Sequence, residues 1–232
     1  STDGGGSWEV TLPRAPGRFL ELAFDTHEPN RAYAMSTRLY VTGDAGLTWE
    51  DRCLFGFQLL AVDPEIPRRV YAISLSKAFA SGDGAATWRE LGEGGGLAPD
   101  PRRYERLTSV VAAGREAGPF VGATSGLHAY DPTSDSWRRM TTYVDFQGLA
   151  RSGRILYGAG AGLAEGRLHY SLDLGMTWHL GSRMPYQRLW DPDGPIAPHA
   201  TSVVVHPGDD RMALVGTTGD GVYRTRDRGR TW

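Results

Sequence analysis

The octapeptide TGDAGLTW (Thr42–Trp49) decides the fold of this 232-residue sequence, because close copies of it recur along the whole chain. Each copy follows the pattern Ser/Thr-x-Asp-x-Gly-x-Ser/Thr-Trp, which we call the repeat turn. The further copies are STDGGGSW (Ser1–Trp8), SGDGAATW (Ser81–Trp88, with Ala85 in place of glycine), SLDLGMTW (Ser171–Trp178) and TRDRGRTW (Thr225–Trp232). A sixth copy, DPTSDSW (Asp131–Trp137), keeps Ser136 and Trp137 but has lost the Asp and Gly positions.

Each residue type in the repeat turn has a physical reason. An Asp carboxylate accepts backbone N–H groups within a tight turn, Ser and Thr do so more weakly, and Gly permits a positive φ. Trp supplies a large apolar body with one N–H donor. The pattern predicts a self-capped hairpin turn with an aromatic plug into the core. The residues with these structural roles are Asp3, Trp8, Asp44, Trp49, Asp83, Trp88, Trp137, Asp173, Trp178, Asp227 and Trp232. Catalytic acids or metal ligands are the alternative interpretation of the five aspartates, but one active site needs one constellation rather than five.

The residues between the repeat turns predict short antiparallel strands. Successive repeat tryptophans lie 39 to 54 residues apart, and a strand-rich period of this length is typical of propeller blades. We therefore predict an all-β fold, a β-propeller of four-stranded antiparallel blades. The expected strands are 19–24, 31–35, 38–41 and 49–54, then 59–62, 70–74, 78–80 and 88–91, and near the end of the sequence 201–205, 212–216 and 221–225.

The repeat turn resembles the Asp-box, also called the bacterial neuraminidase repeat. The flanking phrases AVDPEIPRRVYA (Ala61–Ala72) and GTTGDGVYRTRDRGRTW (Gly216–Trp232) resemble repeats of propellers of the sortilin, xyloglucanase and photosystem II assembly-factor type. The resemblance implies one propeller domain over residues 1–232, with the boxes on the face opposite the usual ligand-binding face. Five blades in a closed ring, or a piece of a six- or seven-bladed ring, both fit the spacing. Asp-boxes occur in enzymes and in non-enzymes, so the resemblance does not choose a function.

Composition narrows the possible partners. The formal net charge of −2 argues against a broad nucleic-acid-binding surface, and no apolar run is long enough to span a membrane. Cys53 is the single cysteine, which excludes an intrachain disulfide and a multi-cysteine zinc site. The six histidines show no metal-ligand spacing, and we expect no cofactor and no metal. A secreted or periplasmic location is favoured slightly over the cytoplasm, and the oligomeric state stays open.

Two long connections carry the candidate ligand-binding residues. They are Gly92–Arg106 and Gly181–Ala200, and the resemblance implies that they open on the face away from the repeat turns. Trp190 is the one Trp that the repeat does not explain. Aromatic, Arg and Asp side chains on such a loop could stack on a sugar ring or form a protein hot spot, or the loop could fold its own aromatics onto the propeller. The candidate residues are Trp190, Tyr186, Arg188, Asp191, Asp193, Arg103 and Tyr104.

These observations favour a non-catalytic binding or scaffold domain that recognises a protein or carbohydrate. The alternative is a glycoside hydrolase, xyloglucanase-like or sialidase-like, or part of one. Hydrolysis needs two carboxylates about 5–9.5 Å apart, and the loop acids that could meet are Asp100, Glu105, Asp191 and Asp193. No catalytic residue is assigned. A repeat domain of a larger extracellular protein is a third interpretation.

Overall fold

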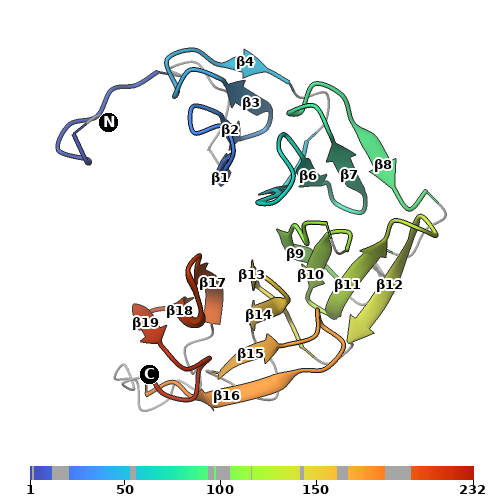
Figure 1. The fold of residues 1–232 in the computed structure, drawn as a ribbon, viewed down its shortest axis with the longest axis vertical. Helices are drawn as coiled ribbons and strands as arrows, with labels where there is room; N and C mark the ends of the chain where they lie inside the picture. The colour runs from blue at the N-terminus through green and yellow to red at the C-terminus, as the bar shows by residue number, and fades with distance from the viewer. Residues whose placement is uncertain are drawn as a thin grey trace. The chain divides into compact units, whose positions relative to one another are not determined.

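The computed structural model describes 232 residues except 2, 12–20, 53–55, 94–96, 98–104, 116, 142–143, 161–166 and 186–199. The described residues form two compact units, residues 1–90 and 91–232. Every regular element in them is a β-strand (Figure 1). Among the described residues, none forms a helix of the length and apolarity needed to cross a membrane.

Unit 1 contains two four-stranded antiparallel sheets, which we call blades 1 and 2. Blade 1 consists of β1 (Glu21–Phe24), β2 (Ala32–Met35), β3 (Leu39–Thr42) and β4 (Glu50–Asp51). Blade 2 consists of β5 (Leu59–Val62), β6 (Val70–Ile73), β7 (Ala78–Ser81) and β8 (Arg89–Leu91).

Unit 2 contains blades 3, 4 and 5. Blade 3 consists of β9 (Leu107–Val111), β10 (Phe120–Ala123), β11 (Gly126–Asp131) and β12 (Ser136–Thr141). Blade 4 consists of β13 (Gly148–Ser152), β14 (Ile155–Ala159), β15 (Arg167–Ser171) and β16 (His179–Arg183). Blade 5 has three strands, β17 (Ala200–His206), β18 (Asp209–Thr217) and β19 (Val222–Thr225).

The predicted fold class is confirmed: the chain is an all-β propeller with five blade sheets, four of them four-stranded. The predicted strand bounds agree within a few residues, and 59–62 coincides with β5. The largest difference is β18, which begins at Asp209 rather than Met212. Pro207 and Gly208 form a two-residue turn, so the ladder extends to the His206–Asp209 pair.

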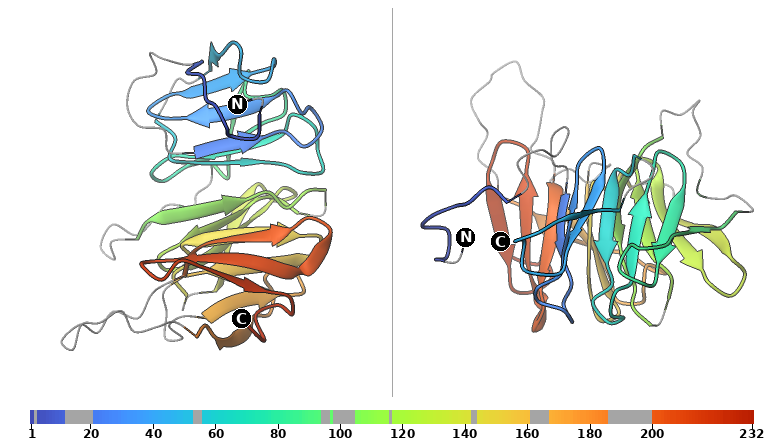
Figure 2. Two further views of the ribbon diagram at one scale, coloured as in Figure 1. Left: turned by 90° about the vertical axis from the view of Figure 1, so that its left-hand side faces the viewer. Right: turned by 90° about the horizontal axis from the view of Figure 1, so that it is seen from above.

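The core of each unit lies between neighbouring blades. In unit 1, Tyr33 and Met35 of blade 1 share a buried cluster with Leu60 and Val70 of blade 2. In unit 2 the sheets lie face against face (Figure 2), with one buried cluster between blades 3 and 4 and another between blades 4 and 5. The fully buried Phe120, Phe146 and Leu168 belong to these clusters. Burial between sheets therefore stabilises the stack within each unit.

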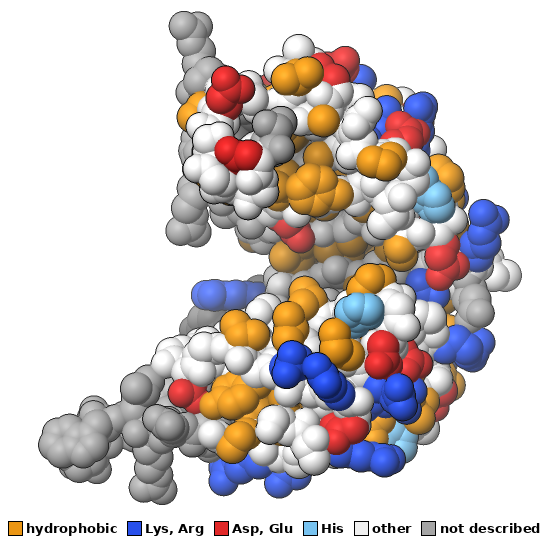
Figure 3. All heavy atoms as spheres, turned by 60° about the vertical axis from the view of Figure 1, so that its left-hand side comes forward, with side chains coloured by type: hydrophobic (Ala, Val, Ile, Leu, Met, Phe, Trp, Pro, Cys, Tyr) orange, Lys and Arg blue, Asp and Glu red, His pale blue; other side chains and the backbone are white. Residues whose placement is uncertain are grey.

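Each blade has two ends that differ in what they carry. Because the strands are antiparallel and consecutive, the repeat turn and the turn joining the first two strands lie at one end of a blade. We call this end the turn face. The connection to the next blade and the turn joining the second and third strands lie at the other end, the connection face. On the side of the molecule that Figure 3 shows, apolar side chains are exposed among charged ones.

Candidate functional site

The five repeat turns that keep the aspartate share one hydrogen-bond pattern. In the turn Thr42–Trp49, Thr48 N and Oγ1 donate to the two oxygens of Asp44 at 2.8 and 2.6 Å. Thr42 Oγ1 donates to Asp44 Oδ1 at 2.8 Å and accepts Gly46 N at 2.9 Å. The same bonds surround Asp3, Asp83, Asp173 and Asp227. Each carboxylate is therefore occupied by donors of its own turn.

These hydrogen bonds keep the aspartates ionised. The Thr48 hydroxyl and backbone N–H, followed by the Thr42 hydroxyl, lower the pKa of Asp44 to about 2. The equivalent donors lower the pKa of Asp173 and Asp227 to about 2, and they lower the pKa of Asp3 and Asp83 further. A carboxylate that binds its proton so weakly is a poor general acid at neutral pH. This chemistry agrees with turn capping.

The repeat tryptophans differ in how far they enter the core. Trp88, Trp178 and Trp232 pack against the three buried clusters, and Trp137 is 8% exposed. Trp8, in contrast, is 80% exposed. Trp8 therefore does not form the expected aromatic plug among the described residues.

The sixth copy of the repeat turn, residues 131–137, is stabilised by hydrogen bonds that differ from those of the other five copies. Trp137 Nε1 donates to the carbonyl oxygen of Leu91 at 3.0 Å, and Asp135 accepts Gly92 N at 3.2 Å. Asp131 accepts Thr133 N at 2.9 Å and Ser134 Oγ at 2.7 Å. This copy therefore fastens β12 to the first residues of unit 2, Leu91 and Gly92, although the Asp–Gly turn has been lost.

The predicted ligand-binding residues fall outside the part of the chain that the structure describes. This holds for Trp190, Tyr186, Arg188, Asp191, Asp193, Arg103 and Tyr104, and for the loop acid Asp100. The prediction for them stays a prediction. Glu105 is the one acid of that set that is described, and its surroundings define the end of the connection before β9.

Glu105 is a buried carboxylate within a polar cluster at the connection face of blade 3. Its side chain is 2% exposed, and its Oε1 accepts Arg139 Nη2 at 2.6 Å and the Ser125 hydroxyl. Arg139 Nη2 also donates to Ser125 Oγ at 2.9 Å, and His128 Nε2 lies 3.7 Å from Glu105 Oε1. Burying a carboxylate is tolerated when it is paired and hydrogen-bonded in this way. The cluster fixes the position of Glu105, just before β9. From the sequence, Glu105 was predicted only as one of the loop acids that could meet for hydrolysis.

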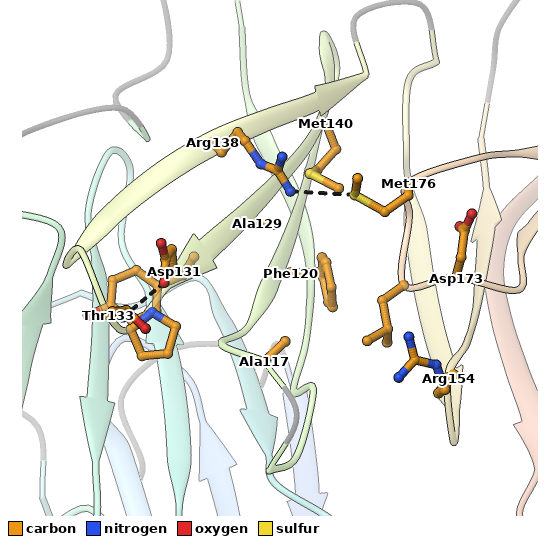
Figure 4. A pocket seen from close by; sticks show the side chains of 13 residues that line it. Ala117, Phe120, Ala129, Asp131, Thr133, Arg138, Met140, Arg154, Asp173 and Met176 are labelled. Carbon is orange, nitrogen blue, oxygen red and sulfur yellow. Dashed lines mark hydrogen bonds between the residues drawn. The ribbon is translucent and has the colours of Figure 1, made fainter.

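A cavity of about 380 Å³ lies between blades 3 and 4 at the turn face (Figure 4). Phe120, Ala129 and Met140 of blade 3 line it together with Leu174 and Met176 from the repeat turn of blade 4. Arg138, Arg154, Asp131 and Asp173 add charged groups. We call it the turn-face pocket. The pocket could not be predicted from the sequence, because it forms only where two copies of the repeat turn meet residues of other strands.

Groups of three or more His, Cys, Asp or Glu that could hold a metal ion are absent from the described residues. Asp100, Asp191 and Asp193 lie outside the described residues, so the pairing of two carboxylates for hydrolysis stays a prediction.

Comparison with known proteins places the fold. No protein-family model matches the sequence, and no curated protein matches it. Among solved structures, the GH74 xyloglucanase from Xanthomonas campestris is similar over 92% of this chain, at 19% identity and a TM-score of 0.67. This chain spans only 38% of that enzyme's length.

Two similar structures contain binding partners. YCF48 bound to a D1 peptide matches 97% of this chain and 70% of its own, at 20% identity and a TM-score of 0.66. A chain of a nidogen/laminin complex matches 86% of this chain and 72% of its own, at 12% identity and a TM-score of 0.60. At these identities the similarity establishes the propeller fold alone. The similar structures include an enzyme, the GH74 xyloglucanase, and two proteins in complex with a peptide or a protein.

Proposed function

We propose that this chain is a non-catalytic binding domain that recognises a protein or carbohydrate through the connections between its blades. The observation that carries the proposal is the cluster of Glu105, Ser125 and Arg139 at the connection face. An ion pair between the buried Glu105 carboxylate and the partly exposed Arg139, with Ser125 as a second donor, gives the connection before β9 a fixed base, and binding surfaces depend on such support. Arg103 and Tyr104 immediately precede that base in the sequence.

Two further observations support binding over catalysis. Glu105, a candidate acid for hydrolysis, is buried and bonded to Arg139 rather than presented to solvent. The similar structures of YCF48 and of the nidogen/laminin complex hold a peptide and a protein partner, respectively. The second candidate function, glycoside hydrolysis, is favoured by the similarity to the GH74 xyloglucanase.

A direct test compares binding with turnover. The chain is screened against arrays of peptides and of glycans that include xyloglucan oligosaccharides, and the release of reducing sugar from xyloglucan is measured in parallel. We expect array binding that falls about tenfold or more in Trp190→Ala, because a stacked aromatic anchor is typical of hot spots. Trp8→Ala is the matched control, since Trp8 is exposed but belongs to a repeat turn.

Two results would contradict the proposal. One is hydrolysis of xyloglucan that is abolished by Asp191→Asn or Asp193→Asn, which would establish the glycoside hydrolase. The other is array binding that Trp190→Ala leaves unchanged and Trp8→Ala removes, which would move the site to the turn face.

A further inference from the structure

The turn-face pocket has the composition of a small-ligand site. Its floor is apolar, with Phe120 only 2% exposed and with Ala117, Ala129 and Met140 beside it. Its volume of about 380 Å³ falls within the range that small-molecule sites usually occupy. The floor therefore favours an apolar group about the size of a phenyl ring or a short alkyl chain.

A guanidinium group lies over this floor with a weak partner. Arg138 extends from β12 toward the repeat turn of blade 4, and its Nη2 lies 3.5 Å from Met176 Sδ (Figure 4). Among the described residues, this thioether sulfur is the one hydrogen-bond acceptor that the Arg138 side chain contacts. A thioether sulfur is a weak acceptor, whereas a carboxylate pairs with guanidinium by two parallel, charge-assisted bonds. A carboxylate would therefore replace the sulfur at a gain.

The acids at the rim are occupied within their own turns. Asp173 accepts Ser171 Oγ, Thr177 N and Thr177 Oγ1, and Asp131 accepts Thr133 N and Ser134 Oγ. Every oxygen of the two carboxylates therefore accepts at least one hydrogen bond within its own turn, whereas the Arg138 guanidinium, among the described residues, donates to the thioether of Met176. The negative charge of Asp131 still opposes an incoming anion, which makes Asp131 a useful probe.

We propose that the turn-face pocket binds an apolar group that bears a carboxylate, with the apolar part against Phe120 and Met140 and the carboxylate on Arg138. Such a group belongs either to a small organic acid or to the free C-terminus of a peptide that ends in an apolar residue. This site lies on the turn face of unit 2, so it is additional to the proposed binding through the connections, and neither depends on the other.

The test uses the methionine methyl groups as local reporters. The chain has five methionines, of which Met140 and Met176 line the pocket. The probe is 4-phenylbutyrate, titrated while the ¹³C-methyl signals of methionine are recorded by NMR. We expect the signals of Met140 and Met176 to shift with a Kd of about 1–10 mM, as the size of the probe allows.

Matched probes and variants isolate the charge. The neutral 4-phenylbutanol and the cationic 4-phenylbutylamine should bind about fivefold or more weakly than the acid. Arg138→Gln should reduce the affinity for the acid to that for the alcohol, and Asp131→Asn should raise it about twofold, because one repulsive charge is removed. Arg138 is exposed, so its replacement should leave the fold intact, which the unchanged signals of the other methionines would verify.

The source of the carboxylate is decided by two peptide probes. Stronger binding of N-acetyl-glycyl-phenylalanine than of phenylbutyrate, lost in its C-terminal amide, would support a peptide C-terminus, and the reverse order would support a small acid. The proposal is overturned if acid, alcohol and amine shift the two methionines equally, if Arg138→Gln leaves the acid's affinity unchanged, or if neither signal moves at about 20 mM probe.

Discussion

Replacing Glu21 by glutamine should stabilise the protein above pH 7 and leave its stability at pH 4.5 unchanged. Glu21 lies on β1, and its Oε2 accepts the backbone N–H of Leu60 on β5 at 2.7 Å. Burial raises the pKa of Glu21 from 4.5 to about 7, and the hydrogen bond from Leu60 opposes the rise only in part. The folded protein therefore holds a proton that the unfolded chain releases between these two pH values.

The magnitude follows from the two pKa values. Because the folded state binds the proton more tightly, stability falls as pH rises from 4.5 to about 7 and then stays constant. At about 1.4 kcal/mol for each pH unit, the ionised folded state is destabilised by up to about 3 kcal/mol. Glutamine keeps an oxygen for the Leu60 N–H and carries no charge. Since Glu21 is partly exposed, we expect Glu21→Gln to stabilise by about 1–3 kcal/mol at pH 8.

Urea denaturation followed by tryptophan fluorescence, at several values between pH 4.5 and pH 8, measures this difference. The control is Glu9→Gln, which changes an exposed glutamate and should have no such effect. A stability difference between Glu21→Gln and the parent protein that does not depend on pH would refute the reasoning, as would a less stable variant at pH 8.

Three further predictions concern the turns. Gly175 has φ +85°, and a Cβ there would lie 3.1 Å from Leu127 Cδ2, so Gly175→Ala should destabilise by about 2 kcal/mol. Gly153 has φ +55° and no atom within 4 Å of an added Cβ, so Gly153→Ala should lower the free energy of unfolding by only about 1 kcal/mol. Equal losses for the two variants in urea denaturation would show that the Leu127 side chain moves aside without cost. Trp137→Phe should destabilise the protein by about 2 kcal/mol, because it leaves the Leu91 carbonyl without its donor. Trp8→Phe should leave the thermal unfolding temperature unchanged, because Trp8 is exposed. A larger loss in Trp8→Phe than in Trp137→Phe would contradict the assigned bonds. Acid should weaken the repeat turns. The pKa of these aspartates falls from 3.8 to about 2 on folding, so each contributes stability above pH 3.8 that is lost as the pH falls toward 2. Asp173→Asn should therefore lose less stability than the parent between pH 4 and pH 2, and parallel pH curves would count against this role.

The sequence predicted the fold well because its signal is local. The bonds from Thr48 to Asp44 span four residues, so the turn and the strands it joins could be inferred from one octapeptide. The site was less predictable. The turn-face pocket brings Phe120 together with Met176, which are far apart in the sequence, and Met176 occupies a position of the repeat turn that varies between copies. Glu105 was noticed as an acid, but its burial depends on Arg139, whose position only the paired strands fix.

One recurring bond bears on how a blade folds. The fourth residue of the repeat turn donates its backbone N–H to the turn that joins the first two strands in three blades: Ala45 to Asn30, Gly84 to Arg68 and Leu174 to Arg154. In blade 5 the equivalent donor, Arg228, bonds to Arg211 near the start of β18. Each pair is only 15 to 20 residues apart, so the loop that must close is short and its entropy loss is modest. Contacts between residues close in the sequence form before distant ones, so we expect folding to begin within single blades. Amide exchange at these four N–H groups should then become protected before the cores between blades form.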